Sequence, residues 1–175
     1  MHKMLRQTMI VIVLLGLSCA GADSTQVVTL ARVIFAETSG VSLSERAAVA
    51  EVIRNRVGHP GFSSLKAAYQ VATCPGQFSG YCSGNHGWKL SSDLKKVGEW
   101  PEVDRRAWED SLTLARELME GKAKPDHGGP VYFHDNGVSK PAKWDNKHWR
   151  AVETRKSEHF TFYRVEKVEK KEKEK

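Results

Sequence analysis

Apolar residues recur every three or four positions near the start of the chain, which predicts an amphipathic helix. This helix should run from about residue 25 to residue 37. Its apolar side carries Val27, Leu30 and Ile34, and Glu37 falls at the next position on that side. A carboxylate therefore stands where a core residue is expected. The alternative is that Glu37 turns outward into solvent at the helix end.

A second helix has the clearest start signal in the sequence. Ser42 and Glu45 have the spacing of a capping box, in which each side chain pairs with a backbone N–H of the other residue. The apolar positions that follow at helical intervals are Leu43, Ala47, Ala50, Ile53 and Val57. We expect a helix that ends before Gly58 and Pro60.

Beyond these helices the pattern predicts two more helices and two strands. They are a short helix over residues 64–72, a helix that opens near Pro101, and strands over residues 131–134 and 159–165. A loop rich in Gly, Ser and Cys follows the short helix, over residues 73–88. If the strands pair, the fold class is α+β, mainly α, with a small antiparallel sheet.

The N-terminal segment has the composition of an export signal. Lys3 and Arg6 precede an apolar run over residues 9–17, and small residues at Ala20 and Ala22 provide a cleavage site. The apolar run is too short to span a bilayer comfortably as a helix. We therefore expect residues 1–22 to be a cleaved signal peptide, and the protein to reach the periplasm, the cell wall or the extracellular space.

A lipoprotein signal is the alternative for this segment, with Cys19 as the lipidated residue, but Gly16 stands where such signals usually have Leu. Cleavage after residue 22 leaves Cys74 and Cys82, which we expect to form a disulfide in an exported chain. At the other end, residues 165–175 mix both charges with few apolar residues and predict a flexible tail. Residues 23–164 then form one domain.

Charge and motif spacing narrow the function classes. The formal net charge is +6 over the whole chain and +4 once Lys3 and Arg6 are removed. This excess suits an anionic envelope polymer or a membrane surface, and no basic stretch resembles a nucleic-acid-binding module. The histidines lack the spacing of a zinc site, and no serine-hydrolase elbow occurs. We expect no metal and no cofactor.

Several separated motifs then resemble the SleB-type cell wall hydrolases, known as spore cortex-lytic enzymes. These motifs are Leu30-Ala31-Arg32, Ala36-Glu37, Ala48-Val49-Ala50, Asn55-Arg56-Val57, Phe62, Gln77-Phe78-Ser79, Gly128-Gly129, Tyr132-Phe133-His134, Lys143-Trp144 and His159 near Phe162-Tyr163. The resemblance covers about residues 27–164. It implies a lysozyme-like, lytic transglycosylase-like fold that cleaves peptidoglycan between N-acetylmuramic acid and N-acetylglucosamine.

The resemblance also implies that Glu37 is the single catalytic glutamate. Burial disfavours the charged form of a carboxyl, which suits a general acid. The family usually has Ala-Arg-Gly-Glu after this residue, whereas this chain has Thr38-Ser39-Gly40-Val41, so a nearby second acid is missing. The further acids that a fold could bring close are Asp93, Asp104, Asp126 and Asp135.

Side chains that suit a sugar complete the expected groove. They are Thr38, Ser39, Gln77, Phe78, Ser79, Tyr132, His134 and Trp144. Thr38 and Ser39 could equally be plain polar residues at a helix end, and Phe78 and Trp144 could be core residues. On the strand, Tyr132 and His134 alternate with Val131 and Phe133, so one pair faces the core and the other the groove or solvent.

With one acid, we expect a lytic transglycosylase that acts as a monomer on glycan strands. In such an enzyme the substrate's own N-acetyl group or 6-hydroxyl supplies the nucleophile, and a 1,6-anhydro product results. The alternatives are plain muramidase hydrolysis, which needs a second carboxylate or a positioned water, and a non-catalytic peptidoglycan-binding protein on the same scaffold.

Overall fold

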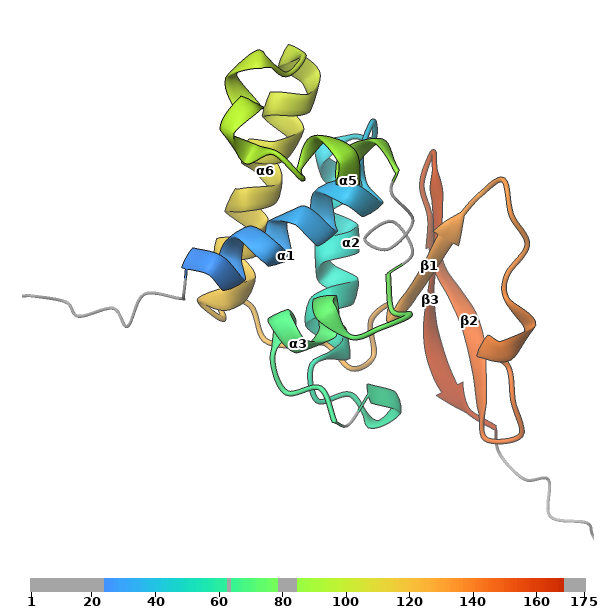
Figure 1. Ribbon diagram of the computed structural model, residues 1–175. Coiled ribbons are helices and arrows are strands. Elements are labelled where there is room, and N and C mark those ends of the chain that lie inside the picture. Colours follow the sequence, from blue (N-terminus) through green and yellow to red (C-terminus); the bar gives the residue numbers. More distant parts are fainter. Residues whose placement is uncertain (1–23, 63, 79–84, 169–175) are drawn as a thin grey trace, which may run out of the picture.

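A lobe of helices and a three-stranded antiparallel sheet lie side by side in the computed structural model, which describes residues 24–62, 64–78 and 85–168 (Figure 1). The α-helices are α1 (Ser24–Glu37), α2 (Leu43–Arg56), α3 (Ala68–Thr73), α5 (His86–Leu90) and α6 (Glu102–Met119). The strands are β1 (Tyr132–Asp135), β2 (Trp149–Lys156) and β3 (Phe160–Lys167). Short 3-10 helices are η1 (Pro60–Phe62), η2 (Leu94–Glu99) and η3 (Ala142–Trp144). The expected α+β class is confirmed.

Helix α1 is the centre of the helical lobe, where it packs against α6, α3 and α5. Its ring at Phe35 is fully buried between two tryptophans, stacked on Trp100 at 5.7 Å and edge-on to Trp108 at 5.8 Å. Such aromatic packing stabilises a core beyond the area that it buries. Because α1 is held on several sides, its last residue, Glu37, has a fixed position.

Helix α2 lies between two hydrophobic clusters. The predicted capping box is confirmed, since Ser42 and Glu45 make both of its hydrogen bonds. Ala50 and Ile53 face the core of the helical lobe. The residues of α2 that instead pack toward the sheet are Ala48, Val49 and Val52. The predicted helix is present, and α2 is covered on two sides.

The sheet has the strand order β1-β3-β2. The predicted pairing of the two aromatic strands is confirmed, with Tyr132 opposite Tyr163 and Phe133 opposite Phe162. Phe133 and Phe162 contact one another and pack toward α2, whereas Tyr132 and Tyr163 point to the other face. Strand β2 was not predicted, because most of its residues are exposed and only Ala151 is buried.

Smaller differences concern the ends of elements. Helix α3 begins at Ala68, four residues later than predicted, because Leu65 still bonds to the turn at Gly58. Helix α5 occupies part of the predicted loop, and Pro101 is the N-cap of α6 and not a first-turn residue. Among the described residues no helix is both long and apolar enough to cross a membrane. The expected signal peptide lies outside those residues, as do positions 169–175 of the tail.

Candidate active site around Glu37

The candidate acid, Glu37, is the last residue of α1 and is partly buried. Helix α5 crosses the end of α1 at Gly87, where an added Cβ would lie 2.8 Å from the carbonyl oxygen of Phe35. The side chain of Asn85 donates a hydrogen bond to the carbonyl of Ala36 and also caps α5 through Trp88 N. Only a residue without a side chain fits this crossing, so Gly87 lets α5 support the acid.

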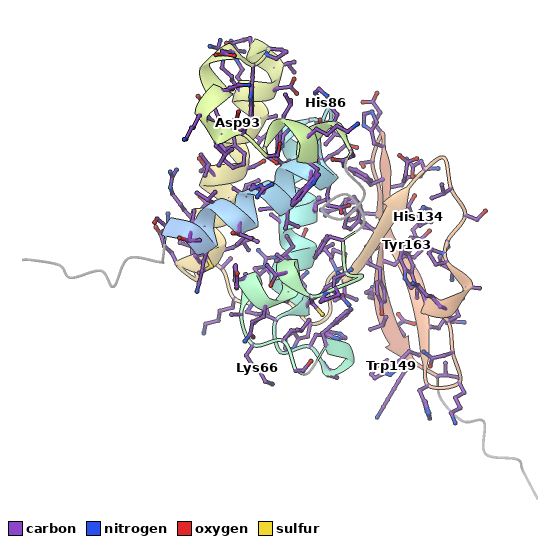
Figure 2. The ribbon with its side chains drawn as sticks, viewed as in Figure 1. Lys66, His86, Asp93, His134, Trp149 and Tyr163 are labelled. Carbon is purple, nitrogen blue, oxygen red and sulfur yellow. The ribbon has the colours of Figure 1, made fainter. Side chains whose placement is uncertain are left out.

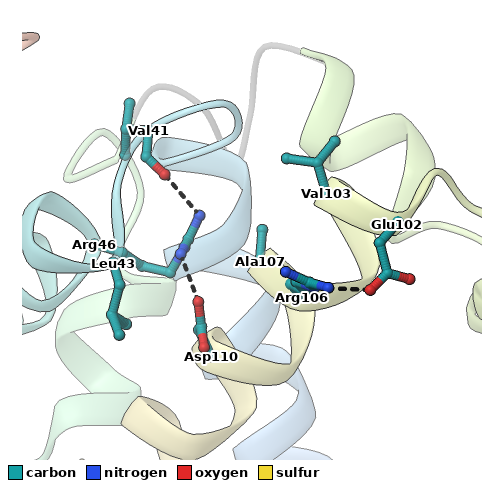
Figure 3. A pocket seen from close by; sticks show the side chains of 8 residues that line it. All are labelled: Val41, Leu43, Arg46, Glu102, Val103, Arg106, Ala107 and Asp110. Carbon is teal, nitrogen blue, oxygen red and sulfur yellow. Dashed lines mark hydrogen bonds and ion pairs between the residues drawn. The ribbon is translucent and has the colours of Figure 1, made fainter.

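Arg46 of α2 binds the segment that follows Glu37. Its guanidinium donates to the carbonyls of Val41 at 3.1 Å and Thr38 at 3.4 Å and pairs with Asp110 of α6 at 3.0 Å. Figure 3 shows this arrangement beside a hollow of about 440 Å³ that Val41 and Asp110 help to line. The hollow is not lined by Glu37, so we assign it no part in the chemistry.

A second arginine of α2, Arg56, is buried at the end of that helix. It donates from Nε to the carbonyl of Val131 at 2.7 Å and from Nη1 to the side-chain oxygen of Gln77 at 3.1 Å. Burial lowers the pKa of Arg56 to about 10, while electrostatic interactions with Tyr132, Glu37 and Cys74 act in the opposite direction. The carboxylate of Glu37 therefore lies within the electrostatic reach of Arg56.

An aromatic cluster covers the face of the sheet opposite the core. Trp144 stacks on Tyr132 at 4.6 Å with an angle of 14° between the rings. His134 bonds to the hydroxyl of Tyr163 at 2.9 Å, and these two residues lie beside one another on the sheet (Figure 2). Tyr132 also packs near Phe62, at 5.7 Å, and faces Arg56. Three of the predicted sugar-binding residues, Tyr132, His134 and Trp144, therefore lie together on this face.

Comparison with known families gives one match. Residues 40–163 match the family model described as Cell Wall Hydrolase. The chain belongs to the cell wall hydrolase family. Neither the search of curated proteins nor that of solved structures gave a match. The predicted resemblance is therefore confirmed, and peptidoglycan is the substrate class that the family indicates. The match begins three positions after Glu37, so the acid itself is outside it.

Two of the expected groove residues of this cell wall hydrolase are buried. Thr38 is fully buried, and its hydroxyl donates to the carbonyl of Ile34 at 2.6 Å. Phe78 is 3% exposed and packs between Arg56 and Phe133. Both contacts are structural, so these side chains hold the end of α1 and the Gln77 loop. By contrast, Ser39 and Gln77 are partly exposed.

The four candidate second acids have other partners or positions. Asp93 is exposed and pairs with Lys96, and buried Asp104 pairs with His86 at 3.2 Å. Asp126 and Asp135 each accept a backbone N–H two residues further along the chain, as is typical of turns. Each side chain is therefore engaged in a local contact.

Two further expectations concern residues that the structure does not describe. Ser79, an expected groove residue, lies outside the described residues. Cys74 is a free cysteine, and the predicted disulfide is not found. Its expected partner, Cys82, also lies outside the described part of the chain.

Sequence reasoning missed several residues that build the site. Arg56 and Asn55 were noticed only as part of a motif, although Asn55 anchors the loop before β1 through Pro130 O at 3.1 Å and Asp126 N at 3.0 Å. Asn85 and Gly87 gave no signal beyond being part of a polar loop. A buried arginine at the end of an apolar helix is the one pattern that could have pointed to Arg56.

Proposed function

We propose that this cell wall hydrolase is a lytic transglycosylase, which cleaves the β-1,4 bond between N-acetylmuramic acid and N-acetylglucosamine with Glu37 as its acid and base. One observation carries the proposal. Glu37 is a partly buried carboxylate at the end of α1, a helix that packs against α6, α3 and α5. A general acid needs a fixed position and a controlled environment, and the partial burial of Glu37 at the end of a packed helix supports that role.

The chemistry follows from one carboxyl group. Glu37 first donates its proton to the glycosidic oxygen, O4 of N-acetylglucosamine, while the bond from that oxygen to C1 of N-acetylmuramic acid breaks. The O6 hydroxyl of the same muramic acid then bonds to C1, and its proton passes to the Glu37 carboxylate. The acid is restored, and the product carries a 1,6-anhydro ring. No water and no second carboxylate enter these steps.

The positions of the other acids support this single-acid scheme. Asp93, Asp104, Asp126 and Asp135 each have a contact of their own, as described above. Glu45 is buried, with 4% of its surface exposed, at the start of α2, where it bonds to His159. A retaining or inverting glycosidase would need one of them beside the sugar opposite Glu37.

The residues that we place against the glycan share polar groups or ring faces that suit a sugar. They are Ser39, Gln77, Ser79, Tyr132, His134 and Trp144. An amide such as that of Gln77 can bond to N-acetyl and hydroxyl groups, while the rings offer apolar faces to the sugar. Thr38 and Phe78 support this surface from within. We further propose that the enzyme is exported, through residues 1–22, and acts as a monomer.

The test is to digest purified peptidoglycan with residues 23–175 and to analyse the muropeptides by mass spectrometry. We expect anhydro-muramyl products from the wild type and none from Glu37→Gln, with a loss of roughly 10²- to 10⁴-fold or more. The exposed residue Glu109 on α6 provides the matched control, Glu109→Gln, which should retain full activity.

Three other outcomes would contradict the proposal in different ways. Products with a reducing muramic acid that depend on Glu37 would indicate plain hydrolysis. Retained binding to peptidoglycan with no product from any wall preparation would indicate a binding protein on the same scaffold. Activity that survives in a folded Glu37→Gln variant would remove Glu37 from the chemistry.

A further inference from the structure

Arg46 occupies a costly position for a cation. Its side chain lies near the start of α2 and is only 3% exposed, and a buried charge is tolerated only where it is paired and hydrogen-bonded. The pair is present, since Nη1 lies 3.0 Å from Oδ2 of Asp110 on α6. In the part of the chain that the structure describes, however, Nε of Arg46 is the one buried side-chain nitrogen or oxygen without a hydrogen-bond partner. An unmet buried donor lowers stability, so stability alone does not account for an arginine here.

The other nitrogen of the guanidinium reaches the turn that follows the candidate acid, over residues 38–41. Nη2 of Arg46 donates to the carbonyl of Val41 at 3.1 Å and to that of Thr38 at 3.4 Å (Figure 3). Thr38 is bonded directly to Glu37, so the contact begins at the residue next to the acid. One side chain therefore joins the segment after the acid to α6.

The hydrogen bonds within this turn are long. The backbone N–H of Thr38 donates to the carbonyl of Phe35 at 3.3 Å, and that of Val41 donates to the carbonyl of Thr38 at 3.3 Å. Both distances exceed the usual range for such bonds. The hydroxyl of Thr38 bonds back to its own helix, at the carbonyl of Ile34. Arg46 adds the hydrogen bonds that tie the turn to α2 and α6.

Helix α6 contacts the chain on both sides of the acid. Trp108 packs edge-on against Phe35 of α1 at 5.8 Å, two residues before Glu37. Asp110 comes two residues after Trp108 and pairs with Arg46. The same stretch of α6 thus holds α1 before the acid and, through Arg46, the turn after it. Contacts on both sides fix the end of a helix better than a contact on one side.

We propose that Arg46 is a positioning residue of the catalytic site, which fixes the turn after Glu37 so that the carboxyl group stays within reach of the glycosidic oxygen. This inference rests on the proposed function of Glu37. A shift of about 1 Å in a catalytic group can lower the rate by roughly 100-fold. The ion pair with Asp110 holds the guanidinium in place, and the guanidinium holds the backbone of Thr38 and Val41.

Apolar replacement of the ion pair separates this role from a purely structural one. Replacing a buried ion pair by apolar side chains of similar size often leaves stability unchanged or raises it. We therefore expect Arg46→Met/Asp110→Leu to keep the wild-type midpoint of denaturant unfolding. On soluble glycan fragments its kcat should fall by roughly 10- to 100-fold while KM is kept, because the turn loses its anchor. Amide hydrogen exchange at Thr38 and Val41 should become faster.

Two further variants complete the test. Arg46→Lys keeps the charge beside Asp110 but replaces the planar fork by a single amine, so kcat should lie between that of the wild type and that of the double variant. Arg106 provides the matched control, because it forms its ion pair beside the same hollow but with Glu102 of its own helix, at 2.7 Å. Arg106→Met should keep the wild-type kcat and the wild-type exchange rates.

The outcomes separate this inference from the proposed function. If activity depends on Glu37 but the folded double variant keeps the wild-type kcat or the wild-type exchange rates, Arg46 is only a structural residue. A fall in kcat that comes only with a lowered unfolding midpoint would assign it to structure as well. If the double variant does not fold by circular dichroism, Arg46→Lys decides, and a wild-type kcat there would overturn the inference. An inactive wild type would overturn the proposed function and this inference together.

Discussion

Glu45 and His159 are 114 positions apart in the sequence, yet Oε2 of Glu45 lies 3.0 Å from Nδ1 of His159. The other carboxylate oxygen accepts from the backbone N–H of His159 at 2.8 Å and from the hydroxyl of Ser157 at 2.7 Å. Glu45 is in the first turn of α2, and His159 directly precedes β3. The contact therefore ties helix α2 to the turn between β2 and β3.

This contact makes the stability of the domain depend on pH. Burial alone raises the pKa of the Glu45 carboxyl, but hydrogen bonds from Ser157 and His159 outweigh it and lower the pKa of Glu45 to about 2. The hydrogen bond that His159 donates to the Glu45 carboxylate raises the pKa of His159 above its usual 6.5. Glu45 thus stabilises the fold above about pH 4.5, and that stability is lost as the pH falls toward 2.

The histidine contributes in the opposite direction. The stability that protonated His159 contributes is complete below pH 6.5 and is lost as the pH rises through the raised pKa of His159. We expect thermal unfolding to show a maximum of Tm between these two limits. Glu45→Gln should flatten the acid side of the profile of Tm against pH. It should also lower the free energy of unfolding by about 2 to 3 kcal/mol at neutral pH. The control is Glu109→Gln, and equal pH profiles for the two variants would contradict the prediction.

Gly87→Ala should damage both stability and activity. The new Cβ would meet backbone atoms of Phe35 at 2.8 Å and Ala36 at 3.0 Å, so α5 must move away from the end of α1. We expect a loss of about 1 to 3 kcal/mol in unfolding free energy and a fall in kcat of roughly 10- to 100-fold. In Gly98→Ala the added Cβ meets nothing within 4 Å, so this variant should behave as wild type.

Asn55→Asp should weaken the loop before β1. The new side chain can still accept from Asp126 N, but as a carboxylate it cannot donate to Pro130 O. We expect a loss of about 3 kcal/mol by denaturant unfolding at neutral pH, and a smaller loss in acid, where the group is protonated and can donate. Asn146→Asp is an exposed control that keeps both of its accepted bonds. A similar loss in the two variants would argue against the predicted role.

Trp144→Ala tests the ring cluster as a sugar surface. Loss of the stack on Tyr132 should cost about 1 kcal/mol in stability. If the cluster binds glycan, KM should rise while kcat is kept. Trp149 lies at the other end of the sheet in Figure 2, so Trp149→Ala is the control. An unchanged KM in Trp144→Ala would assign the ring to packing alone.

Local patterns predicted most helices of the fold and the strand pair β1 and β3. Helix α1 was predicted within one residue at its start, and the capping box of α2 is present as expected. The buried face of α2 was predicted less well, since Leu43 is 55% exposed while Val49 and Val52 are fully buried. Periodicity assumes one apolar side, whereas α2 packs against the other helices of the lobe on one side and against the sheet on the other.

The features that sequence reasoning missed depend on distant partners. Strand β2 lies at the edge of the sheet, so its exposed residues, such as Arg150 and Glu153, show no alternation. Glu45 was predicted as a capping residue, but nothing near it in sequence indicates His159. For the candidate site, Glu37 stood out because it interrupts an apolar face, while Arg56 needs the fold to bring Gln77 to it.

The position of α2 between two layers also determines when this domain can become complete. The face formed by Ala48, Val49 and Val52 packs against Val41 and Phe133 and against Phe160 and Phe162, and the last two come more than a hundred residues later. A growing chain therefore exposes this apolar face until nearly all of the domain has been synthesised. Contacts of such long range slow folding. A shortened chain that ends before β3 would therefore leave this face of α2 without its two aromatic partners, Phe160 and Phe162.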